Sequence, residues 1–301
     1  MPYHLKHHES LPDGMKRIVR EELDAGVATL RAKTRSTREE AIHEARKSIK
    51  KVRAVLKLLR DDLGRVYDKE NARLRDAGRV LSEIRDAGAL LESFEKVMEN
   101  SHKGLSQQAR RTMRHALLSH KTHLEEEKAL ARLLPQVADS LAASRKHFKH
   151  WKFDRHGFAA IDDAFERTFR RGRKALVIVE KSRQSEHFHE LRKRVKDHWY
   201  HVRLLQHVWR DFMEGYEKSL KTLETQLGDD HNLVVLHDVV AASPAAFGKD
   251  SDVAALFNDI KALQDKLRQE ALTTAQLVYQ ESPHRLATRV SHLWGIWKKS
   301  A

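Results

Sequence analysis

Apolar residues recur at helical spacing through most of the 301 residues, and only a few Gly, Pro and short polar stretches interrupt them. One stretch, 133–155, begins near Pro135 and is the best candidate for a connection in the middle of the chain. The pattern therefore predicts an all-α protein, with helices over residues 14–33, 37–62, 67–101, 104–132, 156–183, 185–211, 213–241, 251–281 and 283–298.

A helical segment near residue 43 recurs near residue 189. The first copy reads HEARKSIK over residues 43–50, and the second reads HELRKRVK over residues 189–196. A pair of leucines follows each copy, at 58–59 and at 204–205. We interpret the repeat as a duplicated helical unit, with an N-terminal half over 14–132 and a C-terminal half over 156–298. The expected architecture is two four-helix bundles of long antiparallel helices, related by an approximate two-fold axis.

Each copy of the repeated helix has an apolar face and a cationic face. Like charges three or four positions apart on a helix repel one another, so a row of cations without interspersed acids suits a ligand that carries a row of negative groups. A solvated face is the alternative, and the recurrence in register favours a ligand. The cationic faces consist of His43, Arg46, Lys47, Lys50, Arg53 and Lys57 in the first copy, and of His189, Arg192, Lys193, Lys196 and Arg203 in the second.

The charge and the cysteine content limit the binding partners and the kinds of site that the chain can have. The chain has 57 Lys and Arg against 43 Asp and Glu, a formal charge of +14 without its 20 His, so we expect an anionic partner. The absence of Cys excludes disulfides and thiolate sites. The N-terminus lacks the apolar core of a signal peptide, and no apolar run is long enough to cross a bilayer. We therefore expect a cytoplasmic protein with no membrane partner.

Two further groups are candidates for the site. Arg167, Arg170 and Arg171 begin a basic turn just before the second repeat, and they either extend the anion site or form solvated surface. The pair Arg85-Asp86 falls near the position where Leu227-Gly228-Asp229-Asp230 is expected to end the corresponding helix of the second half. Arg85, Asp86, Asp229 and Asp230 either orient basic side chains of the repeated helices or serve as ordinary helix-end charges.

The order and duplication of these motifs resemble the CHAD family, the conserved histidine α-helical domains. The resemblance covers residues 10–300 as a single domain. It implies two pseudo-symmetric four-helix bundles with a basic central surface that binds inorganic polyphosphate, and association with polyphosphate granules. By motif, the family's binding residues map onto positions 43, 46, 47, 50 and 53 and onto 189, 192, 193 and 196. Trp199 stands where the first copy has Arg53, which predicts that the second half binds less tightly unless Arg203 compensates.

Three other functions compete with polyphosphate binding. An enzyme of phosphoryl transfer or polyphosphate processing is disfavoured, because the sequence has no Gly-rich phosphate loop and no carboxylate cluster suited to Mg²⁺. A metal site at His198 and His201 has no convincing third ligand. Weak nucleic-acid backbone binding remains the main alternative, since any chain of this charge attracts DNA or RNA. The prediction is a binding protein without metal or cofactor.

Overall fold

The computed structural model describes residues 3–32, 38–101, 105–127, 130–148, 151, 153 and 155–300, without the side chains of 83–87, 124–127, 130 and 131. All regular elements of this part are helices, which confirms the predicted all-α class. They are α1 (Leu11–Arg31), α2 (Arg38–Leu58), α3 (Arg60–Leu63), α4 (Arg65–Asn100), α5 (Gln107–Glu127), α6 (Leu130–His147), η2 (Phe158–Ala160), α7 (Asp162–Ser182), α8 (Ser185–Leu204), η3 (Gln206–Val208), α9 (Arg210–Ala242), η4 (Pro244–Phe247), α10 (Asp250–Val278) and α11 (Pro283–Lys299).

Residues 133–155 are not simply a connection, because their first part belongs to α6. This helix packs on α1 and α4. Pro135 lies inside α6 and does not end it. The reason is visible in the buried side chains Ala138, Leu141 and Ser144, which recur at helical spacing and outweigh the single proline.

The two repeated helices end in the same way. Leu59 has φ −92° and ψ 10°, and Leu205 has φ −98° and ψ 8°, so each helix is interrupted after its paired leucines. A short helical turn follows in each half, α3 in the first and η3 in the second. The two long helices predicted over 37–62 and 185–211 are therefore each divided, at equivalent positions.

The order of helices repeats along the chain. The pairs α1 and α7, α2 and α8, and α4 and α9 contain 21 and 21, 21 and 20, and 36 and 33 residues. Buried residues of α4 recur in α9 at the spacing that separates His43 from His189, which is 146 positions. The equivalent buried pairs are Leu74 and Leu220, Ala77 and Leu223, Leu81 and Leu227, and Leu90 and Leu236. Duplication therefore extends from α2 and α8 into the long helices.

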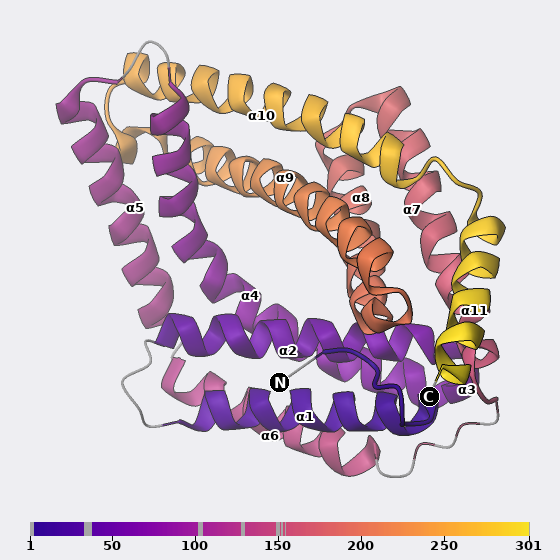
Figure 1. The fold of residues 1–301 in the computed structure, drawn as a ribbon. Coiled ribbons are helices and arrows are strands. Elements are labelled where there is room, and N and C mark those ends of the chain that lie inside the picture. Colours follow the sequence, from indigo (N-terminus) through magenta and orange to yellow (C-terminus); the bar gives the residue numbers. More distant parts are fainter. Residues whose placement is uncertain are drawn as a thin grey trace.

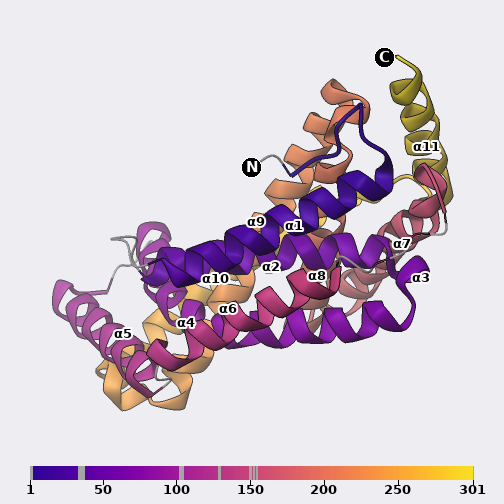
Figure 2. The ribbon, with the colours of Figure 1, turned by 90° about the horizontal axis from the view of Figure 1, so that it is seen from below.

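The hydrophobic core is shared between the two halves. The larger cluster of buried residues contains side chains of α1, α2 and α6 from the first half and of α7, α8 and α11 from the second. The smaller cluster joins the carboxyl-terminal parts of α4 and α9 to α5 and α10. Figures 1 and 2 show α9 running from one group of helices to the other, with α1, α2 and α6 together along one side. Two bundles are compatible with this arrangement, although each core cluster draws on both halves.

Candidate anion-binding site

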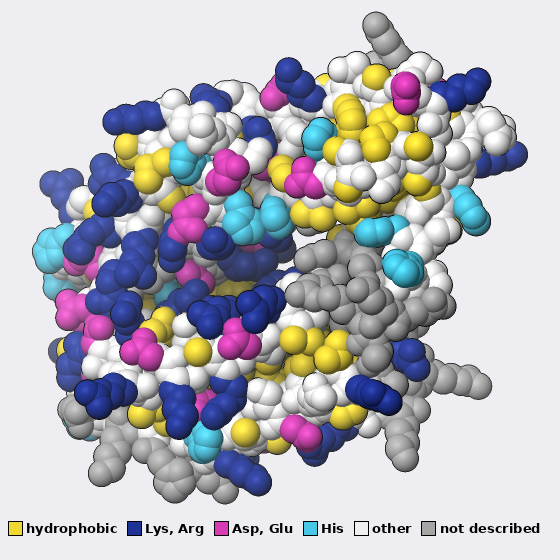
Figure 3. All heavy atoms as spheres, turned by 180° about the vertical axis from the view of Figure 1, so that it is seen from behind, with side chains coloured by type: hydrophobic (Ala, Val, Ile, Leu, Met, Phe, Trp, Pro, Cys, Tyr) yellow, Lys and Arg dark blue, Asp and Glu magenta, His cyan; other side chains and the backbone are white. Residues whose placement is uncertain are grey.

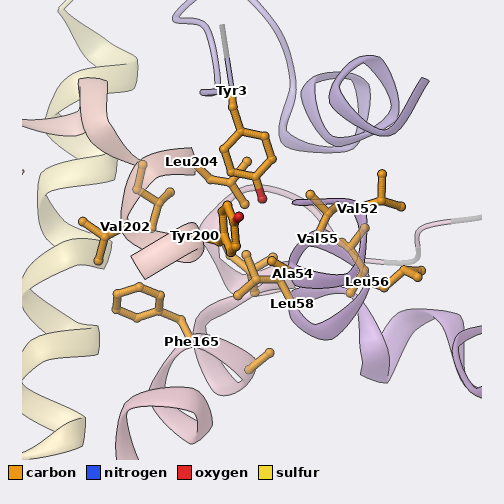
Figure 4. Close-up of a cluster of buried hydrophobic side chains, with 14 of the residues drawn as sticks. Tyr3, Val52, Ala54, Val55, Leu56, Leu58, Phe165, Tyr200, Val202 and Leu204 are labelled. Carbon is orange, nitrogen blue, oxygen red and sulfur yellow. The ribbon is translucent and has the colours of Figure 1, made fainter. Parts of the chain in front are cut away.

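The repeated helices α2 and α8 meet in the core of the protein. Figure 4 shows Ala54 and Leu58 of α2 facing side chains of α8, with Tyr200 and Tyr3 beside them. The Nε2–H of His201 donates a hydrogen bond of 3.0 Å to the backbone carbonyl of Ala54. Contact between these helices fixes how the two cationic faces lie relative to each other.

The apolar faces predicted from the sequence are buried as expected. On both helices these residues are at most 2% exposed, which confirms that each helix has one inward face. The inward residues are Ala45, Ile49, Val52, Leu56 and Leu59 in the first half and Leu191, Val195, His198, Val202 and Leu205 in the second.

Four cations, two from each helix, act on one another across the junction of the halves. Burial and the positive charges of Lys196, Arg46 and Arg192 lower the pKa of Lys50 to about 6. We call Arg46, Lys50, Arg192 and Lys196 the cationic cluster. Figure 3 shows Lys and Arg side chains gathered around a hollow in one face of the molecule. Cations of both predicted stripes are therefore near enough at this junction for their charges to act on Lys50.

The two arginines of the cluster lie against equivalent points of the long helices. Arg46 Nη1 donates to the carbonyl of Ser82 in α4 at 3.3 Å. The guanidinium of Arg192 lies beside Gly228 in α9, where a Cβ atom would stand 3.6 Å from Nη2. Gly228 follows Ser82 by the 146 positions of the repeat. The buried Nε of Arg192 makes no hydrogen bond to the part of the protein that the structure describes, which is costly for a charged group.

Glu224 of α9 is a member of the site that the sequence analysis missed. Its carboxylate is 2.7 Å from Lys196 Nζ and 2.8 Å from Lys221 Nζ. Although burial opposes ionisation, these two ammonium groups lower the pKa of Glu224 to about 2. The clue in the sequence was an acid placed beside Leu220, Leu223 and Leu227 on the buried face of a long helix, where an unpaired charge is costly.

Histidines border the cluster in the second half. The rings of His189 and His231 are 4.3 Å apart, between centroids. Burial, followed by the charges of Arg192, His189, Lys193 and Lys196, lowers the pKa of His231 to about 4. Burial, followed by Lys193 and Arg192, also lowers the pKa of His189. Both rings are therefore neutral at pH 7 and offer hydrogen bonds there in place of charge.

The other predicted cations of the stripes are held by partners around the cluster. Lys57 Nζ bonds both carboxylate oxygens of Asp197 in α8, at 2.6 and 2.7 Å. Arg53 Nε donates to Asn71 Oδ1 at 3.1 Å. Arg203 pairs with Glu217 at 3.3 Å. Outside them lie Lys47 and Lys193, each paired with the glutamate three residues before it, and His43, whose side chain is 50% exposed. The faces are thus less free of acids than the sequence indicated.

The basic group of α7 lies apart from these contacts. Arg167 pairs with Asp61 of α3 at 2.9 Å, and Arg170 pairs with Glu166 on its own helix. Arg171 is exposed. None of these three is among the charges that act most strongly on Lys50. The prediction that they extend the site is not supported by these contacts.

The predicted acidic residues Asp229 and Asp230 pair with cations of neighbouring helices. Asp229 pairs with Lys96 of α4 at 2.7 Å, and Asp230 pairs with Arg268 of α10 at 2.7 Å. Their ion-pair partners thus lie on α4 and α10, although the charge of Arg192 in α8 also acts on Asp230, so an orienting role for Asp230 stays a prediction. They do not end a helix, because α9 continues to Ala242. The side chains of Arg85 and Asp86 lie outside the described residues.

His198 and His201, the residues considered for a metal, are both fully buried. His198 Nε2 is 2.9 Å from the Tyr216 hydroxyl, while His201 bonds Ala54. Each Nε2 thus has its own protein partner. Within the described ranges, no group of three or more potential ligands is placed to hold a metal ion.

Comparison with known proteins identifies the fold and the family of the chain. The fold is similar to the crystal structure of the CHAD domain from the plant Ricinus communis, with a TM-score of 0.61 and 15% identity over 97% of this chain and 95% of that one. Comparison with curated proteins gives no match. Among the helices of the described residues, none has the length and apolar character to span a membrane. The sequence matches the CHAD domain family over residues 17–241. The chain belongs to the CHAD domain family.

Proposed function

We propose that this protein binds inorganic polyphosphate at the cationic cluster. The observation that carries the proposal is the convergence of Arg46 and Lys50 of α2 with Arg192 and Lys196 of α8. Gathering four half-buried basic side chains is unfavourable in the free protein, because each one either repels its neighbours or, like Lys50, loses its charge, and a chain of phosphates relieves this cost. Resemblance to the CHAD family supports the same ligand.

The groups of the cluster suit phosphate oxygens. Arginine donates two parallel hydrogen bonds to a phosphate, and lysine supplies a compact positive charge. Arg192 Nε and His189 Nδ1 are buried and have no hydrogen-bond partner within the described structure, so a small side-chain movement that lets a ligand oxygen or hydroxyl reach them would give each a partner. The side chains of Lys47 and Lys193 are about half exposed, which allows a long chain to continue beyond the cluster.

Competition between polyphosphate and DNA tests the identity of the ligand. We would measure binding of long-chain polyphosphate at near-physiological salt, with DNA as competitor at matched phosphate concentration. A preference for polyphosphate is expected, because two facing pairs of cations fit a narrow chain with a charge on every unit. Equal affinity for DNA would contradict the proposal and favour general binding to nucleic-acid backbones.

Charge-reversal variants test the location of the polyphosphate-binding site. We expect Arg46→Glu, Lys50→Glu, Arg192→Glu and Lys196→Glu each to weaken polyphosphate binding by at least about tenfold. Lys261→Glu makes the same change at an exposed position of α10 and serves as the control. Arg171→Glu shows whether the site extends onto α7. Unchanged binding by all four cluster variants would place the site elsewhere.

Binding without turnover is part of the proposal. The expected result is an unchanged distribution of polyphosphate chain lengths after incubation with the protein and Mg²⁺. We further propose association with polyphosphate granules, for which a fluorescent fusion should follow the granules in cells that store the polymer. Loss of this pattern in the Arg46→Glu variant would link it to the cluster.

A further inference from the structure

The two lysines of the cationic cluster occupy equivalent positions in different electrostatic surroundings. Lys196 has the Glu224 carboxylate 2.7 Å away. Subtracting the 146 positions of the repeat from Glu224 gives Gly78 of α4, which has no side chain to offer. The buried pair Leu81 and Leu227 lies one turn further along and keeps the same register. The first half therefore has a glycine where the second half has a counter-ion.

Lys50 consequently has no carboxylate of its own among the residues that the structure describes. The strongest charges on it come from three helices: Arg46 on α2, Arg192 and Lys196 on α8, and Glu224 on α9. The ammonium group of Lys50 therefore experiences the charges of three cations, and the acid that acts on it most strongly, Glu224, is already bonded to Lys196 and Lys221.

On the other helices that pack against α2, the described charged side chains bond to residues other than Lys50. Glu22 of α1 bonds Lys51 and Ser48. Next to the carboxyl end of α2, Asp61 of α3 pairs with Arg167 of α7. From α4, the backbone carbonyls of residues 81 and 82 accept from Arg46, and the side chains of 83–87, including Glu83, Arg85 and Asp86, lie outside the described residues.

Burial and neighbouring cations disfavour the charged form of Lys50 and lower its pKa to about 6. At pH 8 the free protein therefore holds this amine mostly neutral. A phosphate that reaches the cluster supplies the missing negative charge and restores the ordinary preference of a lysine for its protonated form.

We propose that a phosphate of the bound chain takes the place at Lys50 that Glu224 takes at Lys196, and that Lys50 gains a proton from the solvent as the chain binds. The proton adds to the lone pair of Nζ, and no bond of the phosphate forms or breaks. This inference rests on the proposed function and identifies the first-half lysine as the group that couples binding to pH.

Three other groups at the cluster could gain a proton: the neutral histidines His189 and His231, and Lys196, whose pKa burial also lowers although Glu224 opposes that shift. The ordinary pKa of His189 and His231 is 6.5. At pH 8 they stay mostly neutral even if the ligand cancels the whole of their downward shift. Internal phosphates of a long chain are already ionised at this pH. Proton uptake at pH 8 therefore reports an amine.

Calorimetric titration with long-chain polyphosphate at pH 8, in two buffers of different protonation enthalpy, measures that uptake. We expect about one proton per occupied cluster in the wild type. Lys50→Arg should bind at least as tightly without uptake, because arginine is already protonated at this pH. Lys196→Arg, the equivalent change in the second half, should retain the uptake and is the matched control.

Gly78→Glu tests the missing carboxylate directly. A Cβ atom at residue 78 stands 3.4 Å from Ile49 Cγ2, so a side chain requires little movement. The new acid should hold Lys50 protonated, abolish proton uptake and weaken polyphosphate binding by about tenfold. Gly215→Glu adds the same charge at an exposed position of α9, with no atom within 4 Å of its Cβ, and should retain the uptake.

The outcomes separate this inference from the proposed function. Absence of polyphosphate binding in the wild type would overturn the proposed function. Intact binding without proton uptake, or uptake that persists in Lys50→Arg, would overturn the role of Lys50 alone. Persistent uptake in a folded Gly78→Glu protein would show that the missing carboxylate is not the cause.

Discussion

The helices α2 and α8 carry the same motif in the same register, yet their buried faces contain different chemistry. Val52 and Val55 of α2 correspond to His198 and His201 of α8, and all four side chains are at most 1% exposed. Burial lowers the pKa of each of these histidines to about 3. The first half thus packs with aliphatic side chains where the second uses neutral imidazoles.

This difference shows what a duplicated helix keeps and what it changes. The apolar register is kept, because shifting it would expose the inward face of the helix. A polar side chain enters that face where at least one of its atoms has a partner: His201 Nε2 bonds Ala54 across the two halves, and His198 Nε2 bonds Tyr216 within the second half, while the Nδ1 atom of each has no partner in the described structure. The same principle explains Glu224, a buried acid whose partners are Lys196 and Lys221.

The largest expected effect is a loss of stability in acid, which the buried face of α8 should cause and that of α2 should not. Unfolding returns His198 and His201 to an ordinary pKa of 6.5, so below that pH the unfolded chain binds protons that the folded protein does not. Stability from these residues is complete above pH 6.5 and declines on acidification. We expect the free energy of unfolding to fall by up to about 4 kcal/mol between pH 7 and pH 5.

Denaturant unfolding across this range measures the decline. The double variant His198→Val and His201→Val gives α8 the residues of α2 and should remove most of the slope, whatever its effect on stability at pH 7. His237→Val, at a half-exposed histidine of α9, should leave the slope unchanged. A slope that survives in the double variant would assign the acid sensitivity to other groups.

Glu224→Gln should have the next largest effect and make the second half resemble the first. Lys196 and Lys221 lose their shared counter-ion, and we expect a loss of about 2–3 kcal/mol of stability at pH 7. Polyphosphate binding at pH 6 should become tighter, because the ligand no longer competes with a protein carboxylate. Unfolding curves and titrations measure the two changes.

Glu217→Gln is the control for a general charge effect. It removes an acid that pairs with Arg203 and precedes Glu224 in α9. An equal gain in polyphosphate binding by this variant would weaken the role given to Glu224.

These comparisons also define what the sequence could predict. The sequence predicted the helical class, the repeat and both faces of α2 and α8, because each of these depends on side chains within a few turns of one helix. It did not predict the ion pairs between helices. Glu224 meets Lys196 only because α9 packs on α8, and Asp230 finds Arg268 on α10. Likewise α6 was missed because its buried side chains matter only once α1 covers them.

Trp199 provides a smaller test of the inequality between halves. Its ring lies 4.9 Å from Lys221 Nζ and 5.0 Å from the guanidinium carbon of Arg203, whereas the equivalent Arg53 bonds Asn71. Trp199→Arg should lose these cation–π contacts and destabilise the protein by about 1 kcal/mol, while tightening polyphosphate binding modestly. Trp199→Phe keeps an aromatic face and should change both quantities less. Equal destabilisation by Phe and Arg would attribute the effect to packing of the indole.

The smallest expected effects are those of Lys47→Gln and Lys193→Gln, which remove equivalent exposed charges from the two halves. Within the described residues, each ammonium pairs with the glutamate three residues earlier, at 2.9 and 3.1 Å, so stability should change by less than about 0.5 kcal/mol. We expect each variant to weaken polyphosphate binding by about twofold and to reduce its salt dependence slightly. Binding at several salt concentrations measures both. These two positions match in sequence and in the spacing of their acids, although Glu190 also pairs with Arg194. Clearly unequal losses would mean that the bound chain extends beyond the cluster toward one half, and the more sensitive lysine would mark its direction.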